Sequence, residues 1–254
     1  MSATTNDTVT RAEYCAVACA DMFAGAGEIM ASPMATLPSI GARLARLTTE
    51  PDLLITDGNA LILADTPGLG RQGRVEGWMP FSKVFDVVAW GRRHVVMGAN
   101  QLDRYGNQNI SAFGPMDKPT RQMFGVRGGP GNAINHATSY WVGKHSTRVF
   151  AEQVDVVCGV GYDKADPDNP AYRFLNNYRV VSNLGVFDYS GPGRTMHALS
   201  LHPGVTAEQV RENTSFEIDG LDAAGVTRDP SDEELRLIRE VIDPKSLRDR
   251  EVAQ

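Results

Sequence analysis

The sequence predicts an α/β fold with an open, mixed and mainly parallel sheet that is covered by helices on both faces. Three observations predict it. Strand and helix patterns alternate along most of the chain, which is typical of a parallel or mixed sheet. Several predicted strands are short apolar runs, as in strands buried on both faces. The 254 residues, 42% hydrophobic and 22% charged, suffice for one large domain. We therefore expect a disordered tail over residues 1–10 and a single domain over residues 11–254.

In the first half of the chain, apolar residues at helical spacing predict helices over residues 11–23, 38–47 and 80–90. The first helix begins after Thr10, whose hydroxyl can cap it, and Glu13 stands where the acid of a capping box belongs. Buried strands are predicted over residues 52–58 and 92–97, with a glycine-rich loop over residues 68–77 between them.

In the second half, residues 98–131 are polar, rich in glycine and without periodicity, which predicts a long ordered loop. Strands are expected at 148–150 and 154–158, a hairpin at 178–181 and 184–188, and a further strand at 196–201. Helices are expected over residues 207–213, capped by Thr206, and over residues 231–242, capped by Ser231 with Glu234 three residues later.

Composition excludes several classes of function. The chain carries 25 Lys and Arg against 31 Asp and Glu, a formal charge of −6, so no basic stripe is available for nucleic acid or for a membrane surface. The cysteines Cys15, Cys19 and Cys158 have no zinc-ligand spacing, and no metal site is predicted. No signal peptide and no apolar run of about 18 residues is visible, so we expect a cytoplasmic protein.

Familiar catalytic motifs are incomplete. The G-x-G-x-x-G pattern at residues 68–73 follows Thr66-Pro67 and cannot open a long helix, which favours a simple loop over a dinucleotide site. Neither a phosphate-binding loop nor a nucleophile elbow is present. Of the five histidines, only His136, nearest the glycine-rich segment, is kept as a candidate for function.

Two polar segments combine the residue types of a ligand-binding site. A predicted strand ends in Gly98-Ala99-Asn100-Gln101, which places amides and bare backbone N–H groups at the carboxyl edge of the sheet. Further on, Arg127 precedes Gly128-Gly129-Pro130-Gly131, where the backbone can approach a ligand and form an oxyanion site. The candidate binding residues are Gly98, Asn100, Gln101, Tyr105, Asn109, Gly128, Gly129 and Asn132, with Arg127 as a fixed positive charge beside them.

These segments resemble the β subunits of class I coenzyme A transferases. The family element G-A-x-Q-x-x-x-Y-G-[DN] matches residues 98–107, and the family's G-x-G-G region corresponds to residues 125–129. Residues 184–188 look like its later hairpin, and Pro203-Gly204-Val205-Thr206 with Val210 and Thr214 resembles its C-terminal element. The matches occur in order over residues 11–216, and they imply the open α/β/α sandwich of that family.

The chain departs from the transferase pattern at the nucleophile. Family transferases carry S-E-N-G at the end of an early strand, where this chain has Thr56-Asp57-Gly58-Asn59. Asp57 is one methylene shorter than the glutamate that forms the covalent intermediate, and a retreat of about 1 Å can lower a rate about 100-fold. We therefore expect Asp57 to line the substrate site or cap a turn, not to act as the transfer nucleophile.

Asp57 and Arg127 together resemble the branch of the family whose α2β2 complexes hydrolyse a ring carbon–carbon bond of a cyclohexenone carboxyl-CoA in bacterial steroid (cholesterol) catabolism. The resemblance implies retro-Claisen chemistry, an α partner subunit that supplies the acid/base glutamate, and no cofactor beyond the coenzyme A of the substrate. Arg127 would stabilise developing oxyanions. Two alternatives stay open: a coenzyme A transferase that uses Asp57 or a partner carboxylate, and a non-catalytic acyl-CoA-binding subunit.

Overall fold

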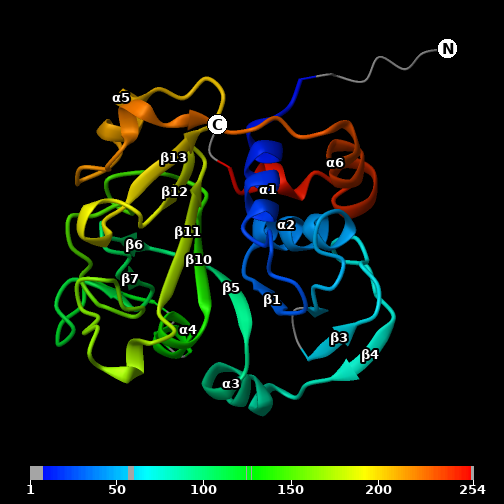
Figure 1. Ribbon diagram of the computed structural model, residues 1–254, viewed down its shortest axis with the longest axis horizontal. Helices are drawn as coiled ribbons and strands as arrows, with labels where there is room; N and C mark the ends of the chain where they lie inside the picture. Colours follow the sequence, from blue (N-terminus) through cyan, green and yellow to red (C-terminus); the bar gives the residue numbers. More distant parts are fainter. Residues whose placement is uncertain (1–7, 57–59, 124, 127, 253–254) are drawn as a thin grey trace.

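A sheet of seven strands organises the molecule in the order β1, β5, β10, β11, β12, β13, β14 (Figure 1). The computed structural model describes residues 8–56, 60–123, 125–126 and 128–252. Four of the six neighbouring strand pairs are parallel, and β12 is antiparallel to both of its neighbours. The predicted mixed, mainly parallel sheet is therefore confirmed. The strands are β1 (Met30–Pro33), β5 (Arg93–Gly98), β10 (Ala137–Val142), β11 (Asn176–Ser182), β12 (Gly185–Asp188), β13 (His197–Leu201) and β14 (Gly225–Val226).

Helices cover one face of this sheet. α1 (Arg11–Asp21) and α2 (Thr36–Leu47) lie beside α6 (Asp232–Arg236), which continues as a wider π-helical turn over Leu237–Ile242 (Figure 1). α1 begins with the predicted capping box of Thr10 and Glu13. A Cβ on Gly41 would stand 2.6 Å from Cys19 Cβ, so α1 and α2 pack with their backbones in close approach. This helical layer buries Cys15 and Cys19, both of which are free thiols.

Loops and short elements cover the other face. They pack on Val95, Met97, Tyr140 and Phe187 of the sheet. α3 (Phe81–Trp90) and α4 (Gly129–Asn135) lie near the lower edge in Figure 1, and α5 (Ala207–Glu212) near the upper edge. The short strands are β2 (Ile55–Thr56), β3 (Leu61–Leu63), β4 (Val75–Trp78), β6 (Gln101–Leu102), β7 (Gln108–Asn109), β8 (Ala112–Phe113) and β9 (Arg121–Gln122), and 3₁₀ turns span Pro170–Tyr172, Pro192–Arg194, Leu221–Ala223 and Leu247–Arg250.

Most predicted elements are confirmed, with small shifts at their ends. The helices α1, α2, α3 and α5, the strands β5 and β13, the hairpin of β11 and β12, and the capped C-terminal helix all appear. Of the predicted tail, residues 1–7 lie outside the described residues and Thr10 is the N-cap of α1. The tail boundary and the single domain stay predictions.

Two strand predictions are wrong, one is confirmed in part, and several strands were missed. Residues 148–150 and 154–158 form no strand and contribute only the isolated bridge of Phe150 with Leu102. Of the strand predicted over 52–58, residues 55–56 form β2, which belongs to a separate three-stranded sheet with β3 and β4, while residues 57 and 58 lie outside the described residues. The predicted loop over 68–77 ends in β4. The sequence analysis missed β1, the central β10 and β14 of the main sheet, the short strands β3, β4 and β6 to β9, and helix α4. In β10, Thr138 and Ser139 are buried because Asn132 O accepts from the Thr138 hydroxyl and His94 shares a bond with that of Ser139, a compensation that no apolar pattern reveals.

Four buried histidines make the fold sensitive to acid. Burial lowers the pKa of His94, His136 and His202 to about 4 and that of His145 to about 3. Unfolding returns each to about 6.5, so the unfolded state binds more protons below that pH. We expect the free energy of unfolding to fall between pH 6.5 and 4.5, by about 1.4 kcal/mol per pH unit for each histidine.

Unfolding measured from pH 7.5 to pH 4.5 checks this expectation. His145 bonds Ser182 Oγ and Thr214 Oγ1, both at 2.9 Å, so His145→Gln is a suitable comparison because glutamine keeps a donor and an acceptor but does not titrate. The free energy of unfolding of His145→Gln should fall less steeply with pH, because one titrating group fewer takes up a proton on unfolding. Equal slopes for the two proteins would contradict the assignment.

Candidate active-site cleft

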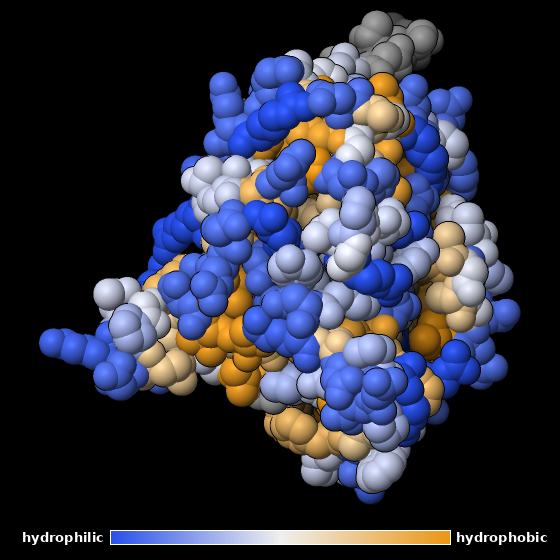
Figure 2. Space-filling view, turned by 60° about the vertical axis from the view of Figure 1, so that its left-hand side comes forward, coloured by the Kyte–Doolittle hydropathy of each residue, from blue (hydrophilic) through white to orange (hydrophobic). Residues whose placement is uncertain are grey.

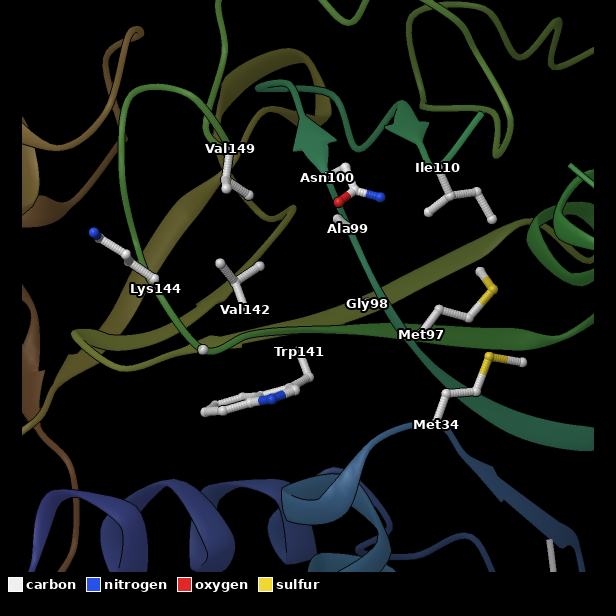
Figure 3. Close-up of a pocket in the computed structure, with 11 residues that line it drawn as sticks. Met34, Met97, Gly98, Ala99, Asn100, Ile110, Trp141, Val142, Lys144 and Val149 are labelled. Carbon is white, nitrogen blue, oxygen red and sulfur yellow. The ribbon is translucent and has the colours of Figure 1, made fainter. Parts of the chain in front are cut away.

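A cleft runs along the sheet from the carboxyl ends of β5 and β10 to the edge strand β1. Three adjoining cavities make it up, with volumes of about 380, 360 and 520 Å³. Met34 lines all three, and Arg93 lines the second and third. Figure 3 shows the first cavity, with Met34 and Met97 on one side and Lys144 on the opposite side. The cleft therefore has a polar outer end at Asn100 and Lys144 and an apolar middle.

The structure brings the two predicted segments together in this cleft. Gly98 and Asn100 line the first cavity, where both are exposed. Gly128, Gly129 and Asn132 line the second cavity. Met97 and Ile110 line both cavities and connect them. Five predicted residues from segments about thirty residues apart thus line adjoining cavities, and their binding roles stay predictions.

Three other predicted binding residues lie outside these cavities. The amide of Asn109 donates to Gln101 Oε1 at 2.6 Å and to Ala112 O at 2.7 Å, and its Oδ1 accepts from Ser111 N at 2.9 Å. Gln101 Oε1 also accepts from Asp155 N at 2.9 Å. Tyr105 lies in the turn between β6 and β7, where its carbonyl accepts from Tyr162 N. The geometry favours a structural role for these residues, which hold the loop in shape.

Arg127 and Asp57 lie outside the residues that the structure describes. Their described neighbours border the cleft: Val126 and Gly128 line the second cavity, and Ile55 and Thr56 line the third. The catalytic role of Arg127 and the binding role of Asp57 stay predictions.

The sequence analysis did not identify two parts of the cleft: helix α3, which forms one wall, and the buried cation Arg93. Helix α3 supplies Phe81, Val84, Phe85 and Val88 to the second cavity, whereas the sequence predicted the helix without assigning it to the site. Arg93 is 5% exposed, and burial lowers the pKa of its guanidinium to about 10. Its position at the start of a strand gave no signal, because arginines at strand ends are usually exposed.

His136, the histidine kept as a candidate, is buried beside this cluster. Its Nε2 lies 3.1 Å from Val88 O, which fits an N–H donated to that carbonyl, and Nδ1 has no partner among the described residues. Burial, together with the nearby charge of Arg93, lowers the pKa of His136 to about 4. At neutral pH it is therefore an uncharged imidazole behind the cleft.

The described lining of the cleft holds cations and no carboxylate. Its charged side chains are Arg43, Arg93 and Lys144, and no aspartate or glutamate is present among the described lining residues. No group of three side chains that could hold a metal ion occurs in the described parts of the chain. Such a site can bind anionic oxygens, but a general base must enter from Asp57 or from another chain.

Gly98 offers a test that this cleft is the functional site. A Cβ added at Gly98 meets no atom within 4 Å, so Gly98→Val should fold normally while its side chain fills part of the first cavity. We expect kcat/KM to fall about tenfold, the equivalent of about 1.4 kcal/mol, with an unchanged melting temperature. Gly225→Val in the remote strand β14 is the matched control. Full activity of Gly98→Val would place the site elsewhere.

Comparisons with known proteins agree on one group of relatives, although no protein-family model matches the chain. The chain is 77% identical over 245 residues to the cholesterol ring-cleaving hydrolase IpdB subunit of Rhodococcus jostii, covering 96% of this chain and 97% of that protein. It is 28% identical to one of the subunits of the 3-oxoadipate CoA-transferase of Pseudomonas knackmussii, over 80% of this chain and 82% of that one.

Solved structures show the same relationship. The crystal structure of Rhodococcus jostii IpdAB contains a chain that superposes with a TM-score of 0.96 at 77% identity, covering 97% of this chain and 99% of that one. Glutaconate coenzyme A-transferase from Acidaminococcus fermentans superposes with a TM-score of 0.78 at 23% identity, covering 94% of this chain and 97% of that chain, which shows a shared fold.

Proposed function

Because this chain belongs to the family of IpdB subunits of cholesterol ring-cleaving hydrolases, which have the class I coenzyme A transferase fold, we propose that its cleft binds a cyclic β-keto acyl-CoA and that water opens the ring there. The chain is the β subunit of a hydrolase and works with an α subunit. The substrate is the last steroid ring, held as a cyclohexenone carboxyl-CoA to which water has added across the conjugated double bond.

The observation that carries the proposal is a long cleft rich in cations and without a described carboxylate. Hydrolysis of a carbon–carbon bond beside a ketone develops negative charge on oxygen twice, first on the ring ketone and then on the thioester. The cations and the N–H groups of the glycine loop suit those charges. The described lining offers no carboxylate that could act as a general base, which agrees with a site that a glutamate of the α subunit completes.

The reaction proceeds in two stages. The α-subunit glutamate takes a proton from water, the water oxygen bonds to the ring carbonyl carbon, and the carbonyl electron pair moves to its oxygen. When this oxyanion collapses, the ring carbon–carbon bond breaks and its electron pair passes to the thioester enolate, which Arg127 stabilises. The enolate carbon then takes a proton, and the new carboxylic acid ionises. Coenzyme A enters and leaves as a thioester, and no further cofactor takes part.

The α partner also explains the exposed apolar surface of the chain. Apolar side chains reach the surface in several patches (Figure 2). Helix α3 has no buried residue, and Phe81, Phe85 and Trp90 are 64%, 48% and 89% exposed. Since α3 forms one wall of the cleft, a subunit that covers it would also reach the reacting atoms. We propose an α2β2 assembly in the cytoplasm, where the three buried cysteines stay reduced.

Acceptor dependence tests the proposed function against its main alternative. The co-purified complex should consume 2-oxocyclohexanecarboxyl-CoA, a minimal cyclic β-keto acyl-CoA, without any added carboxylic acid. A coenzyme A transferase would need the acceptor and would form an acyl-enzyme, which hydroxylamine or borohydride traps at Asp57 or at a partner carboxylate. A non-catalytic subunit would bind acyl-CoA, and substitution of Arg127 or Asn100 would not change the rate of the complex. Either result would replace the hydrolase proposal.

None of the described helices combines the length and the apolar content needed to cross a bilayer.

A further inference from the structure

Arg93 is a buried cation without an anionic partner in the described chain. Its guanidinium contacts two neutral groups, with Nη1 at 3.5 Å from Ser32 Oγ and Nη2 donating to Asn132 Oδ1. Its Nε is buried and has no hydrogen-bond partner among the described residues. Only desolvation shifts its pKa, and the value of about 10 leaves it charged at neutral pH. Arg93 therefore carries a buried positive charge that the described chain does not neutralise.

Two other buried arginines, Arg248 and Arg43, differ from Arg93 in their hydrogen-bond partners. Arg248 is 6% exposed, and its guanidinium bonds Asp243 Oδ2 at 3.1 Å and Glu13 Oε1 at 3.2 Å. Arg43, 9% exposed, has only neutral partners, as Arg93 does, but its Nε donates to Pro67 O and its Nη1 to Ser39 O, whereas the buried Nε of Arg93 has no partner among the described residues. Burying a charge without such partners destabilises a fold. Among the described residues no anion neutralises Arg93, so its charge is available to an anionic group that enters the cavities it lines.

The position of Arg93 in the cleft indicates which anion this is. It lines the second and third cavities, at the end away from Asn100 and Lys144. Between these two ends lies the apolar wall of Val84, Phe85 and Met97, which suits a hydrocarbon ring and not the polar coenzyme. A substrate whose coenzyme occupies the outer end would therefore point its ring toward Arg93.

We propose that Arg93 binds the ring-ketone oxygen of the substrate and the carboxylate that the reaction makes from it. This inference rests on the proposed function. When the water oxygen bonds to the ketone carbon, the ketone oxygen becomes an oxyanion. After the ring carbon–carbon bond breaks, that oxygen and the water oxygen form the new carboxylate. A guanidinium offers forked donors that fit both species, so Arg93 acts on the oxygen of the ring ketone.

A binding experiment with two acyl-CoA probes tests the proposal without turnover. Pimeloyl-CoA is the ring-opened product of 2-oxocyclohexanecarboxyl-CoA and ends in a carboxylate, whereas heptanoyl-CoA has the same chain length and no carboxylate. The wild-type complex should bind pimeloyl-CoA at least about tenfold more tightly, since a hydrogen bond to a charged group contributes about 1.5 kcal/mol or more. Arg93→Met should abolish that preference and leave heptanoyl-CoA binding unchanged. Arg92→Met, at the exposed neighbouring position, is the matched control.

Kinetics and stability separate this role from a structural one. Arg93→Met should lower kcat at least about tenfold without lowering the melting temperature, because it removes an unpaired buried charge. Guanidinium ions should restore part of the activity of Arg93→Ala. A retained preference for pimeloyl-CoA in Arg93→Met, or a lowered melting temperature without guanidinium rescue, would overturn the proposal. If the wild-type complex prefers pimeloyl-CoA but does not hydrolyse the ring, the binding role stands and the proposed function fails.

Discussion

Replacement of Arg127 by alanine is expected to lower kcat of the complex about 100-fold or more, the effect of removing one donor to a developing oxyanion. Its described neighbours Val126, Gly128 and Gly129 line the second cavity, and the described lining there holds no carboxylate that would neutralise a cation. Because the interaction strengthens in the transition state, KM should change much less than kcat. Steady-state kinetics of the co-purified complex with 2-oxocyclohexanecarboxyl-CoA measure both constants.

A matched variant shows whether the effect belongs to the site. Arg121 lies in β9 of the same long segment and is exposed, so Arg121→Ala should keep full activity. Arg127→Lys should recover only part of the rate, since an ammonium keeps the charge but not the forked donors. Normal turnover by an intact Arg127→Ala complex would contradict the catalytic assignment.

Replacement of Glu13 by alanine is expected to destabilise the chain by about 3 kcal/mol, the cost of leaving buried charge unpaired. Glu13 is fully buried in α1 and joins two distant arginines, accepting from Arg239 Nε at 2.7 Å and from Arg248 Nη2 at 3.2 Å. It also accepts from Thr10 N at 2.9 Å in the capping box. The carboxylate therefore connects the start of α1 to the C-terminal segment.

The melting temperature of the complex should fall by roughly 10 °C in Glu13→Ala. Glu240→Ala is the control, because the exposed Glu240 lies 3.9 Å from Arg236 and such surface pairs contribute under about 1 kcal/mol. Burial alone would raise the pKa of Glu13, but the bonds from Arg239 and Thr10 and the charge of Arg248 outweigh it and lower the pKa below its usual value. Its contribution to stability is thus present above about pH 4.5 and lost in stronger acid. An unchanged melting temperature in Glu13→Ala would show that the cluster is dispensable.

The fold could be predicted where local chemistry and periodicity agree. Thr10 and Ser231 form the capping boxes that the sequence indicated, and Thr206 caps α5 as predicted. β10 could not be predicted in this way, because its buried Thr138 and Ser139 depend on acceptors elsewhere in the fold. The apolar residues Val149 and Phe150 suggested a strand but pack as a loop, with Phe150 stacked on His145.

The sequence indicated candidate site residues only where the residue type itself marks a ligand site. Gly98 and Gly129 were found because a glycine at the end of a strand or in a tight loop marks a place where a ligand can approach. Gln101 and Asn109 have the same chemistry as Asn100, and only the folded loop distinguishes amides that bond each other from one that faces the cavity. Arg93 was missed because the sequence does not show which side chains surround it. Only the folded chain shows that its described neighbours are neutral.

The position of oxygen from water in the product tests the central claim most directly. The co-purified complex and 2-oxocyclohexanecarboxyl-CoA would be incubated in ¹⁸O-water without any acceptor acid, and the product would be fragmented in a mass spectrometer. We expect pimeloyl-CoA with its thioester intact and one heavy oxygen in the new carboxylate, which requires hydrolysis of the ring carbon–carbon bond. Free coenzyme A with the ring still closed, or reaction only after an acceptor acid is added, would contradict the account and return Asp57 to consideration as the nucleophile.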